Sequence, residues 1–395
     1  MIKSIKKYFT GLSKNTILIT FASLFSDIAT EMLYPILPIF LIQTLKTSGS
    51  ILGLIEGIAQ ATQNIVQGFS GWLSDRMQRR KPIALAGYLL GAMAKPLIGM
   101  SVFWQSALGA RFLDRLGTGI RSAPRDALIA SSVRKEHRGK AFGLEGIGDN
   151  LGAFLGPLLT ILLISVMAID IRLIFYLAFI PGFLAFCMIL LVKEKPIGVK
   201  TKQRLSVNFQ QFPKSYRKYL LATALFGIGN SSNSFLILQT QSISTSLVTT
   251  VLIYAGFNLV AAFISYPAGF LSDQYGRKNI LLASFIIFFV TYLGFALTHS
   301  IILIAILFIF YGLFQGIFRA VGKALAIDLV PEQLHASGIG WYAATIGLPG
   351  LVASVVAGLL WDNVSHSAVF LYGAAFSIIG GIMLMWLVPS TTAID

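Results

Sequence analysis

Two stretches of this chain, GWLSDRMQRRKP (residues 71–82) and GFLSDQYGRKNI (residues 269–280), repeat one pattern about 200 positions apart. Each runs from a glycine to an aspartate four positions later and then to basic residues, and each follows a long apolar segment. A second pair agrees with the first, because GIRSAPRDALIA (residues 119–130) aligns without a gap with GIFRAVGKALAI (residues 316–327). Self-similarity on this scale indicates an internal duplication. We therefore expect two halves built on one plan.

The composition predicts an all-α membrane protein. Of 395 residues, 55% are hydrophobic and 12% are charged, and the mean hydropathy is +0.76, whereas about a quarter of the residues of a soluble domain are charged. Apolar runs of about 20 residues, the length that spans a bilayer as a helix, recur along the chain. We expect twelve transmembrane helices, near residues 16–43, 48–72, 82–100, 105–131, 141–166, 171–192, 218–240, 247–271, 279–298, 302–329, 337–361 and 368–388.

The duplication and the charges predict the domain organisation. We expect an N-terminal six-helix bundle (1–192), a basic cytoplasmic linker (193–217) and a C-terminal six-helix bundle (218–395). Basic residues gather on alternate loops, so the positive-inside rule predicts a multi-pass protein of the cytoplasmic (inner) membrane with both termini cytoplasmic. The first span carries acids and is too long for a cleaved signal peptide. The net charge of +15 then favours contact with anionic lipid rather than nucleic acid.

No motif for a cofactor or a metal is recognisable. A single cysteine, Cys187, excludes an internal disulfide, and the four histidines lie in or beside loops without zinc or haem spacing. GIFRAVGK misses the spacing of a phosphate-binding loop by one residue. We expect a monomer whose partners are a small-molecule substrate, protons and the lipid bilayer.

Leaving aside residues at the span edges, fifteen charged residues lie within the expected spans, and a charge at bilayer depth is costly unless it is paired or faces water. Eight are acids and seven are bases, so ion pairing accounts for many of them. Twelve lie in the first half, which we infer carries the protons. The fifteen are Asp27, Glu31, Glu56, Lys95, Arg111, Asp114, Arg115, Arg121, Arg125, Asp126, Glu145, Asp149, Arg319, Lys323 and Asp328.

The expected fourth helix has one polar face. At about 100° per residue its charged residues, from Arg111 to Asp126, fall within an arc of roughly 140°. In the first helix, Asp27 and Glu31 are four residues apart and share a face. Two acids against a basic face can exchange a proton, so we expect them to be the coupling pair, although salt bridges that only hold the helices together stay an open alternative.

The expected fifth helix, GLEGIGDNLGAFLGP (residues 143–157), places two acids and two glycines, Gly152 and Gly156, on one stripe. We expect the full proton-coupling set to be Asp27, Glu31, Arg111, Asp114, Arg115, Glu145 and Asp149.

The seventh helix contains GIGNSSNSF (residues 227–235), which is too polar to face lipid. Either the helix breaks there and offers backbone groups to a substrate, or the side chains bond helix to helix. We expect the substrate to be bound by Tyr34, Glu56, Gln60, Asn64, Arg121, Asn230, Asn233, Gln239, Arg319 and Lys323.

Two parallel halves of six helices, with this loop motif twice in corresponding places, resemble the major facilitator superfamily. The resemblance covers nearly the whole chain and implies gating by Gly71, Asp75, Arg76, Arg79, Asp126, Gly269, Asp273 and Arg277. Arg111 matches the helix-4 arginine that the family associates with proton coupling, while Arg115 stands where the family usually has glycine. GAFLGP is similar to the helix-5 motif of proton antiporters, although Thr160 and Ile161 replace its last glycines. Gln78 stands where the first loop should have its turn glycine.

We therefore expect a proton-coupled secondary transporter that moves a small, polar, anionic organic solute, of the carboxylate-metabolite or metal-chelator type, by alternating access. A multidrug/proton antiporter would need a more aromatic and less basic pocket. A metal-ion exporter lacks histidine ligands. Outside transport, a membrane receptor stays open, as does an intramembrane aspartyl protease, whose short GIGD signature occurs here without the partner motif.

Overall fold

The computed structural model describes residues 13–77, 79–134, 138–194, 209–331 and 334–389. Every regular element in these ranges is helical. Nine helices in this part of the chain are long and apolar enough to cross a membrane. The expected all-α membrane fold, with two six-helix bundles related by internal duplication, is confirmed.

The helices follow the apolar runs closely. The first half contains α2 (Lys14–Glu31), α3 (Leu37–Ile39), η1 (Phe40–Thr44, a π-helix), α4 (Gly49–Met77), α5 (Lys81–Gly99), α6 (Trp104–Ser132), α7 (Arg138–Ser165), α8 (Ile171–Leu177) and α9 (Phe179–Leu191). The second half contains η3 (Phe209–Gln211), α10 (Lys214–Gly229), α11 (Ser234–Ser244), α12 (Leu247–Tyr275), α13 (Arg277–Leu297), α14 (Ile301–Asp328), α15 (His335–Asn363) and α16 (His366–Leu387). The domain limits at 192 and 218 stay a prediction.

Two of the expected spans are broken near their middle. The seventh is interrupted between α10 and α11, at the Asn and Ser cluster, so the helix does break there, while substrate binding at the break stays a prediction. Side chains of the cluster also bond to other helices, as the alternative expected. The first stops at Glu31, just before Pro35, because proline lacks an amide hydrogen and disfavours helix in the residue before it. The Met32 carbonyl beside this break accepts a hydrogen bond of 2.7 Å from the Thr160 hydroxyl, which satisfies a buried backbone group.

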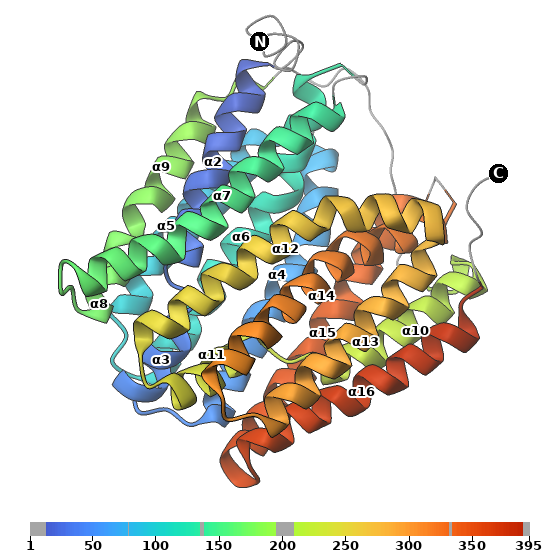
Figure 1. The fold of residues 1–395 in the computed structure, drawn as a ribbon. Coiled ribbons are helices and arrows are strands. Elements are labelled where there is room, and N and C mark those ends of the chain that lie inside the picture. The colour runs from blue at the N-terminus through green and yellow to red at the C-terminus, as the bar shows by residue number, and fades with distance from the viewer. Residues whose placement is uncertain (1–12, 78, 135–137, 195–208, 332–333, 390–395) are drawn as a thin grey trace, which may run out of the picture.

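The two halves meet along two helix pairs. In Figure 1 most of the first half, coloured blue to green, lies to the upper left of the second half, coloured yellow-green to red. Within the first half, α2 packs on α7 and α9, and α4 and α5 pack on α6. Between the halves, α4 packs on α15 and α7 packs on α12. A space between the halves is therefore bordered by α4, α7, α12 and α15.

An apolar cluster closes one end of this space. The cluster joins Phe40 and Leu52 of the first half to Phe235, Val251 and Ala357 of the second, and all five are buried. We call this the sealed end; the connections from η1 to α4 and from α15 to α16 lie there. We call the other end the mouth end; it holds the connection from α4 to α5.

Candidate transport cavity

A cavity of about 890 Å³ lies between the two halves. Its walls come from α2, α4, α6 and α7 on one side and from α10, α12, α14 and α15 on the other. It extends to Trp72 of α4, Asp126 of α6 and Lys323 of α14, each within two turns of the end of its helix at the mouth end. The cavity is thus closed toward the sealed end and reaches the mouth end.

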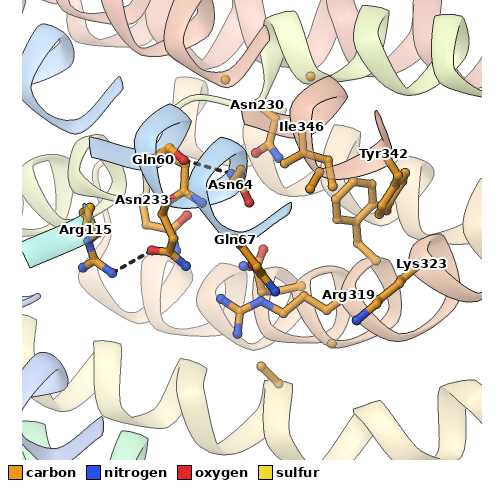
Figure 2. Close-up of a pocket in the computed structure, with 18 of the residues that line it drawn as sticks. Gln60, Asn64, Gln67, Arg115, Asn230, Asn233, Arg319, Lys323, Tyr342 and Ile346 are labelled. Atoms are coloured by element: carbon orange, nitrogen blue, oxygen red, sulfur yellow. Dashed lines mark hydrogen bonds between the residues drawn. The ribbon is translucent and has the colours of Figure 1, made fainter. Parts of the chain in front are cut away.

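Most of the predicted site residues line this cavity. In Figure 2, Gln67 of α4 and Arg319 of α14 project into the same space, so both halves contribute. The predicted residues that line it are Asp27, Glu31, Tyr34, Gln60, Asn64, Gly71, Arg115, Asp126, Asp149, Asn230, Asn233, Arg319 and Lys323. Among the described residues, six predicted ones stand behind the wall: Glu56, Arg111, Asp114, Arg121, Glu145 and Gln239.

Two cavity-lining amides on α4 were not among the residues expected from the sequence. Gln63 and Gln67 line the cavity together with Gln60 and Asn64. Steps of four residues found only Gln60 and Asn64, whereas the helical period of 3.6 includes positions i+3 and i+7 on the same face. One face of α4 therefore presents four carboxamides to the cavity.

Behind the wall, Arg111 is the centre of a buried charge network. Its Nε and Nη2 donate to the two carboxylate oxygens of Glu56, at 2.9 and 3.2 Å, and its Nη1 donates to Asp114 at 2.9 Å. Lys95 Nζ lies 3.0 Å from the other oxygen of Asp114. Glu56 also accepts a hydrogen bond of 3.3 Å from Ser232 at the helix break of the second half. The network thus joins α4, α5 and α6 and reaches across to the other half.

Arg115 connects this network to the cavity. Its Nε lies 3.6 Å from Asp114, and its Nη1 donates to Gln63 at 3.1 Å. Its Nη2 is buried and has no hydrogen-bond partner among the described residues. Counting Arg115, three cations face the two carboxylates of Glu56 and Asp114, so this network has one net positive charge, and Arg115 also attracts the carboxylate of Glu31. Arg115 lines the cavity, while its unpartnered Nη2 lies beneath the cavity surface.

A second charged group, nearer the mouth end, has the opposite balance. Arg125 Nη1 lies 2.9 Å from Glu145 and 3.7 Å from Asp149, and its Nη2 lies 3.0 Å from Asp126. Ser23 of α2 donates to Glu145 at 2.8 Å. The single guanidinium of Arg125 is therefore shared by three carboxylates.

Asp27 belongs to the same acidic group. It lies 4.0 Å from Arg121 of α6, as expected for an acid of the first helix facing the fourth. It also interacts with Asp149 of α7. Together, two arginines are shared by four carboxylates, and Asp27 and Asp149 line the cavity.

Glu31 has a different partner from the one the sequence suggested. Its Oε2 accepts hydrogen bonds from the Tyr254 hydroxyl at 2.9 Å and from Asn258 Nδ2 at 3.3 Å, both on α12 of the other half. Arg115 and Arg319 attract its carboxylate electrostatically. Neither α12 residue was expected from the sequence, although an asparagine within an apolar span was a usable signal. Glu31 therefore bridges the two bundles.

The glycines of α7 set the position of both acids. A Cβ on Gly152 would lie 2.8 Å from the Asp27 Cβ, and one on Gly156 would lie 2.9 Å from the Glu31 Cβ. These approaches are shorter than side-chain contacts allow, so only glycine lets α7 pack this closely on α2. The two glycines that the sequence places on one stripe of this helix therefore both lie at the contact with α2.

The expected gating residues are only partly within the described part of the chain. Gln78 and the side chains of Asp75, Arg76 and Asp273 lie outside it, and Arg79 is exposed. In the second copy of the motif, Gly276 has φ 86°, as expected for a turn glycine, and Arg277 lies 2.7 Å from Asp328.

The remaining gating positions differ between the copies. A Cβ on Gly71 would lie 3.1 Å from the Ala123 Cβ, whereas one on Gly269 would meet no described atom within 4 Å. Asp126, one of the expected gating residues, pairs with its neighbour Arg125. The gating roles stay predictions.

Comparison with known proteins gives consistent matches. The family model described as Major Facilitator Superfamily matches residues 19–220 and 219–393. An uncharacterized MFS-type transporter of Methanocaldococcus jannaschii is 35% identical over 95% of both chains. A probable 4-methylmuconolactone transporter of Cupriavidus pinatubonensis is 27% identical over 90% of this chain and 86% of its own. Among solved structures, the nucleoside transporter NupG is 13% identical with a TM-score of 0.79, over 95% of this chain and 100% of its own.

Proposed function

Because this chain belongs to the major facilitator superfamily, whose members are membrane transporters and not enzymes, we propose that it moves a small anionic organic solute in exchange or together with protons. The observation that carries the proposal is one cavity lined by Arg115, whose buried Nη2 has no partner among the described residues, and by Glu31 on a neighbouring helix, whose carboxylate bridges the two halves.

The orientation of the cavity supports a transport cycle. Basic residues of the α4–α5 connection, Arg79 to Lys81, lie at the mouth end, which the positive-inside rule assigns to the cytoplasm. We therefore take the protein to lie in the cytoplasmic membrane with both termini inside, and the conformation to face inward. Alternating access then requires the apolar cluster at the sealed end to separate when the cavity opens outward.

The charge balance around Arg115 supports an anionic solute. A buried guanidinium with one unpartnered nitrogen and a surplus positive charge attracts a carboxylate or phosphate, and arginine binds such groups through two parallel hydrogen bonds. Arg319 and Lys323 add positive charge on the opposite wall. The amides of α4 and of the α10–α11 break supply neutral donors and acceptors for the rest of the solute.

The acidic group supports proton coupling. Four carboxylates share Arg121 and Arg125, an excess of negative charge that proton binding relieves. Glu31 adds the link to movement, because an ionised carboxylate accepts both hydrogen bonds from α12 while a protonated one becomes a donor. Protonation of Glu31 would therefore weaken one contact between the bundles. Asp27, Glu31 and Asp149 are our candidates for the proton carriers.

The relatives agree with an organic solute. The name of the relative from Cupriavidus pinatubonensis refers to a small lactone, and the cavity of about 890 Å³ has room for a molecule of that size. The competing interpretation is an exporter of lipophilic drugs. The charged residues of the cavity walls favour an anionic solute over a lipophilic one.

The test is flux into proteoliposomes with an imposed pH gradient. The probes are benzoate, malate, 4-methylmuconolactone and the lipophilic cation tetraphenylphosphonium. We expect at least one of the organic-acid probes to move in a gradient-dependent way, and Arg115→Gln to abolish that flux. Lys46→Gln, which removes an exposed cation outside the cavity, is the matched control. Flux of tetraphenylphosphonium alone, or anion flux that ignores the gradient, would overturn the proposal.

A further inference from the structure

One carboxylate of the second half caps a helix of the first half at the sealed end. Asp362, at the end of α15, accepts hydrogen bonds from the Gly49 amide at 2.8 Å and from the Ser50 amide at 2.7 Å. The Ser50 hydroxyl donates to the same carboxylate at 2.5 Å. The first amides of a helix have no partner within the helix, so an acidic cap satisfies them and also interacts favourably with the helix dipole. Here the cap comes from more than 300 residues away and from the other bundle.

Below this cap, α4 and α15 are held at backbone contact by small residues. A Cβ on Gly53 would lie 2.0 Å from the Ser354 carbonyl oxygen, and one on Gly57 would lie 3.0 Å from the Leu351 carbonyl oxygen. A Cβ on Gly358 would lie 2.3 Å from the Gly49 carbonyl oxygen. Glycines at four-residue intervals permit this approach, as they do between membrane helices in general. Because these backbone contacts are so short, even a small separation of α4 from α15 would break them.

The cap sits where the protein must open. The residue before it, Trp361, packs against the apolar cluster of the sealed end and stacks on His366 at 3.7 Å. The cavity lies on the other side of that cluster. A change to outward access therefore has to break the contacts of Asp362 with α4, whereas the contacts within each bundle can persist.

We propose that Asp362 is the outer latch of the protein: its cap on α4 holds the sealed end closed and sets the ratio of inward-facing to outward-facing molecules. This rests on the proposed function only through alternating access, and it is independent of which solute or ion is carried. Asp362 is a positioning residue, since it lies away from the cavity.

The test is a distance measurement across the sealed end. Spin labels are placed on Lys46→Cys and Ser300→Cys, which are exposed at that end on different bundles, in a Cys187→Ser background. The protein is measured in liposomes without solute or pH gradient, by pulsed electron paramagnetic resonance. We expect Asp362→Ala to raise the ratio of long to short distances roughly fivefold, the factor that corresponds to about 1 kcal/mol for a lost helix cap. Asp362→Asn, which keeps one of the two acceptor oxygens, should raise it less. Ser50→Ala, which removes one of the three hydrogen bonds, should shift it less in the same direction.

The matched control is Asp170→Asn. Asp170 also caps a helix at this end, accepting from the Arg172 amide at 2.8 Å, but within one bundle. We expect its distances to equal those of the unsubstituted protein. The latch would be overturned if the spin-label distances in folded Asp362→Ala equalled those in Asp170→Asn and only the melting temperature fell. Asp362 would then have a structural role alone. Because no solute is present, this result is separate from failure of the flux experiment.

Discussion

Replacing Arg111 by methionine should strongly destabilise the protein, and the structure gives the size of the effect. Arg111 makes three hydrogen bonds to two carboxylates, and the side chains of Glu56 and Asp114 are only 5% and 3% exposed. Removing one member of a buried ion pair typically costs about 3–5 kcal/mol, because the other charge is left without compensation. We expect a loss in that range for Arg111→Met.

A double-mutant cycle isolates the cause. Glu56→Gln removes the charge that Arg111→Met leaves uncompensated, so the double variant should be less destabilised than the sum of the two single variants, by about 1–3 kcal/mol. The assay is the free energy of unfolding in detergent micelles, followed by helical circular dichroism. Strict additivity, or a cost below about 1 kcal/mol for Arg111→Met, would refute the claim that the buried pairing of Arg111 with Glu56 and Asp114 supports the cavity wall.

Three further substitutions follow from the packing and pairing. Gly156→Leu should lower the free energy of unfolding by about 1–3 kcal/mol and impair gradient-driven flux, because the new side chain would push α7 away from α2. The control is Gly146→Leu on the same helix. A Cβ there meets no described atom within 4 Å, so this substitution should be nearly neutral in both assays. Thr160→Val keeps the shape but leaves the buried Met32 carbonyl without its donor, so unfolding should become easier by about 1–3 kcal/mol; an unchanged melting curve would contradict this. Arg277→Gln breaks a partly exposed pair with Asp328, and calorimetry should detect a loss below about 1 kcal/mol, a larger loss being inconsistent with solvent screening.

The positions of the helices could be predicted from the sequence because bilayer thickness sets the length of each apolar run. The lengths of the apolar runs did not show whether the helix continues unbroken through each run. The break at the Asn and Ser cluster of the seventh span left a polar signal, and that break was anticipated as one of two interpretations. The break after Glu31 was missed, although Pro35 gave a local signal, because its surroundings are apolar on average.

The sequence predicted those features of the candidate site that depend on a single helix, such as which side chains share a face. Helical periodicity placed Asp27 and Glu31 on one face of the first helix. The expectation that this face meets the fourth helix is correct for Asp27, which lies 4.0 Å from Arg121 of α6. It could not reveal that Glu31 bonds Tyr254, because that contact depends on how two bundles pack. For the same reason the cap of Asp362 on α4 has no signature in either local sequence.

The central claim is that carboxylates of α2 in the cavity bind the protons that drive transport. The most direct test compares two modes of flux in the Asp27→Asn/Glu31→Gln double variant, using whichever anion the unsubstituted protein transports. We predict that accumulation driven by a pH gradient is lost while exchange of labelled for unlabelled anion, which needs no net proton movement, continues. Accumulation equal to that of the unsubstituted protein would contradict the account.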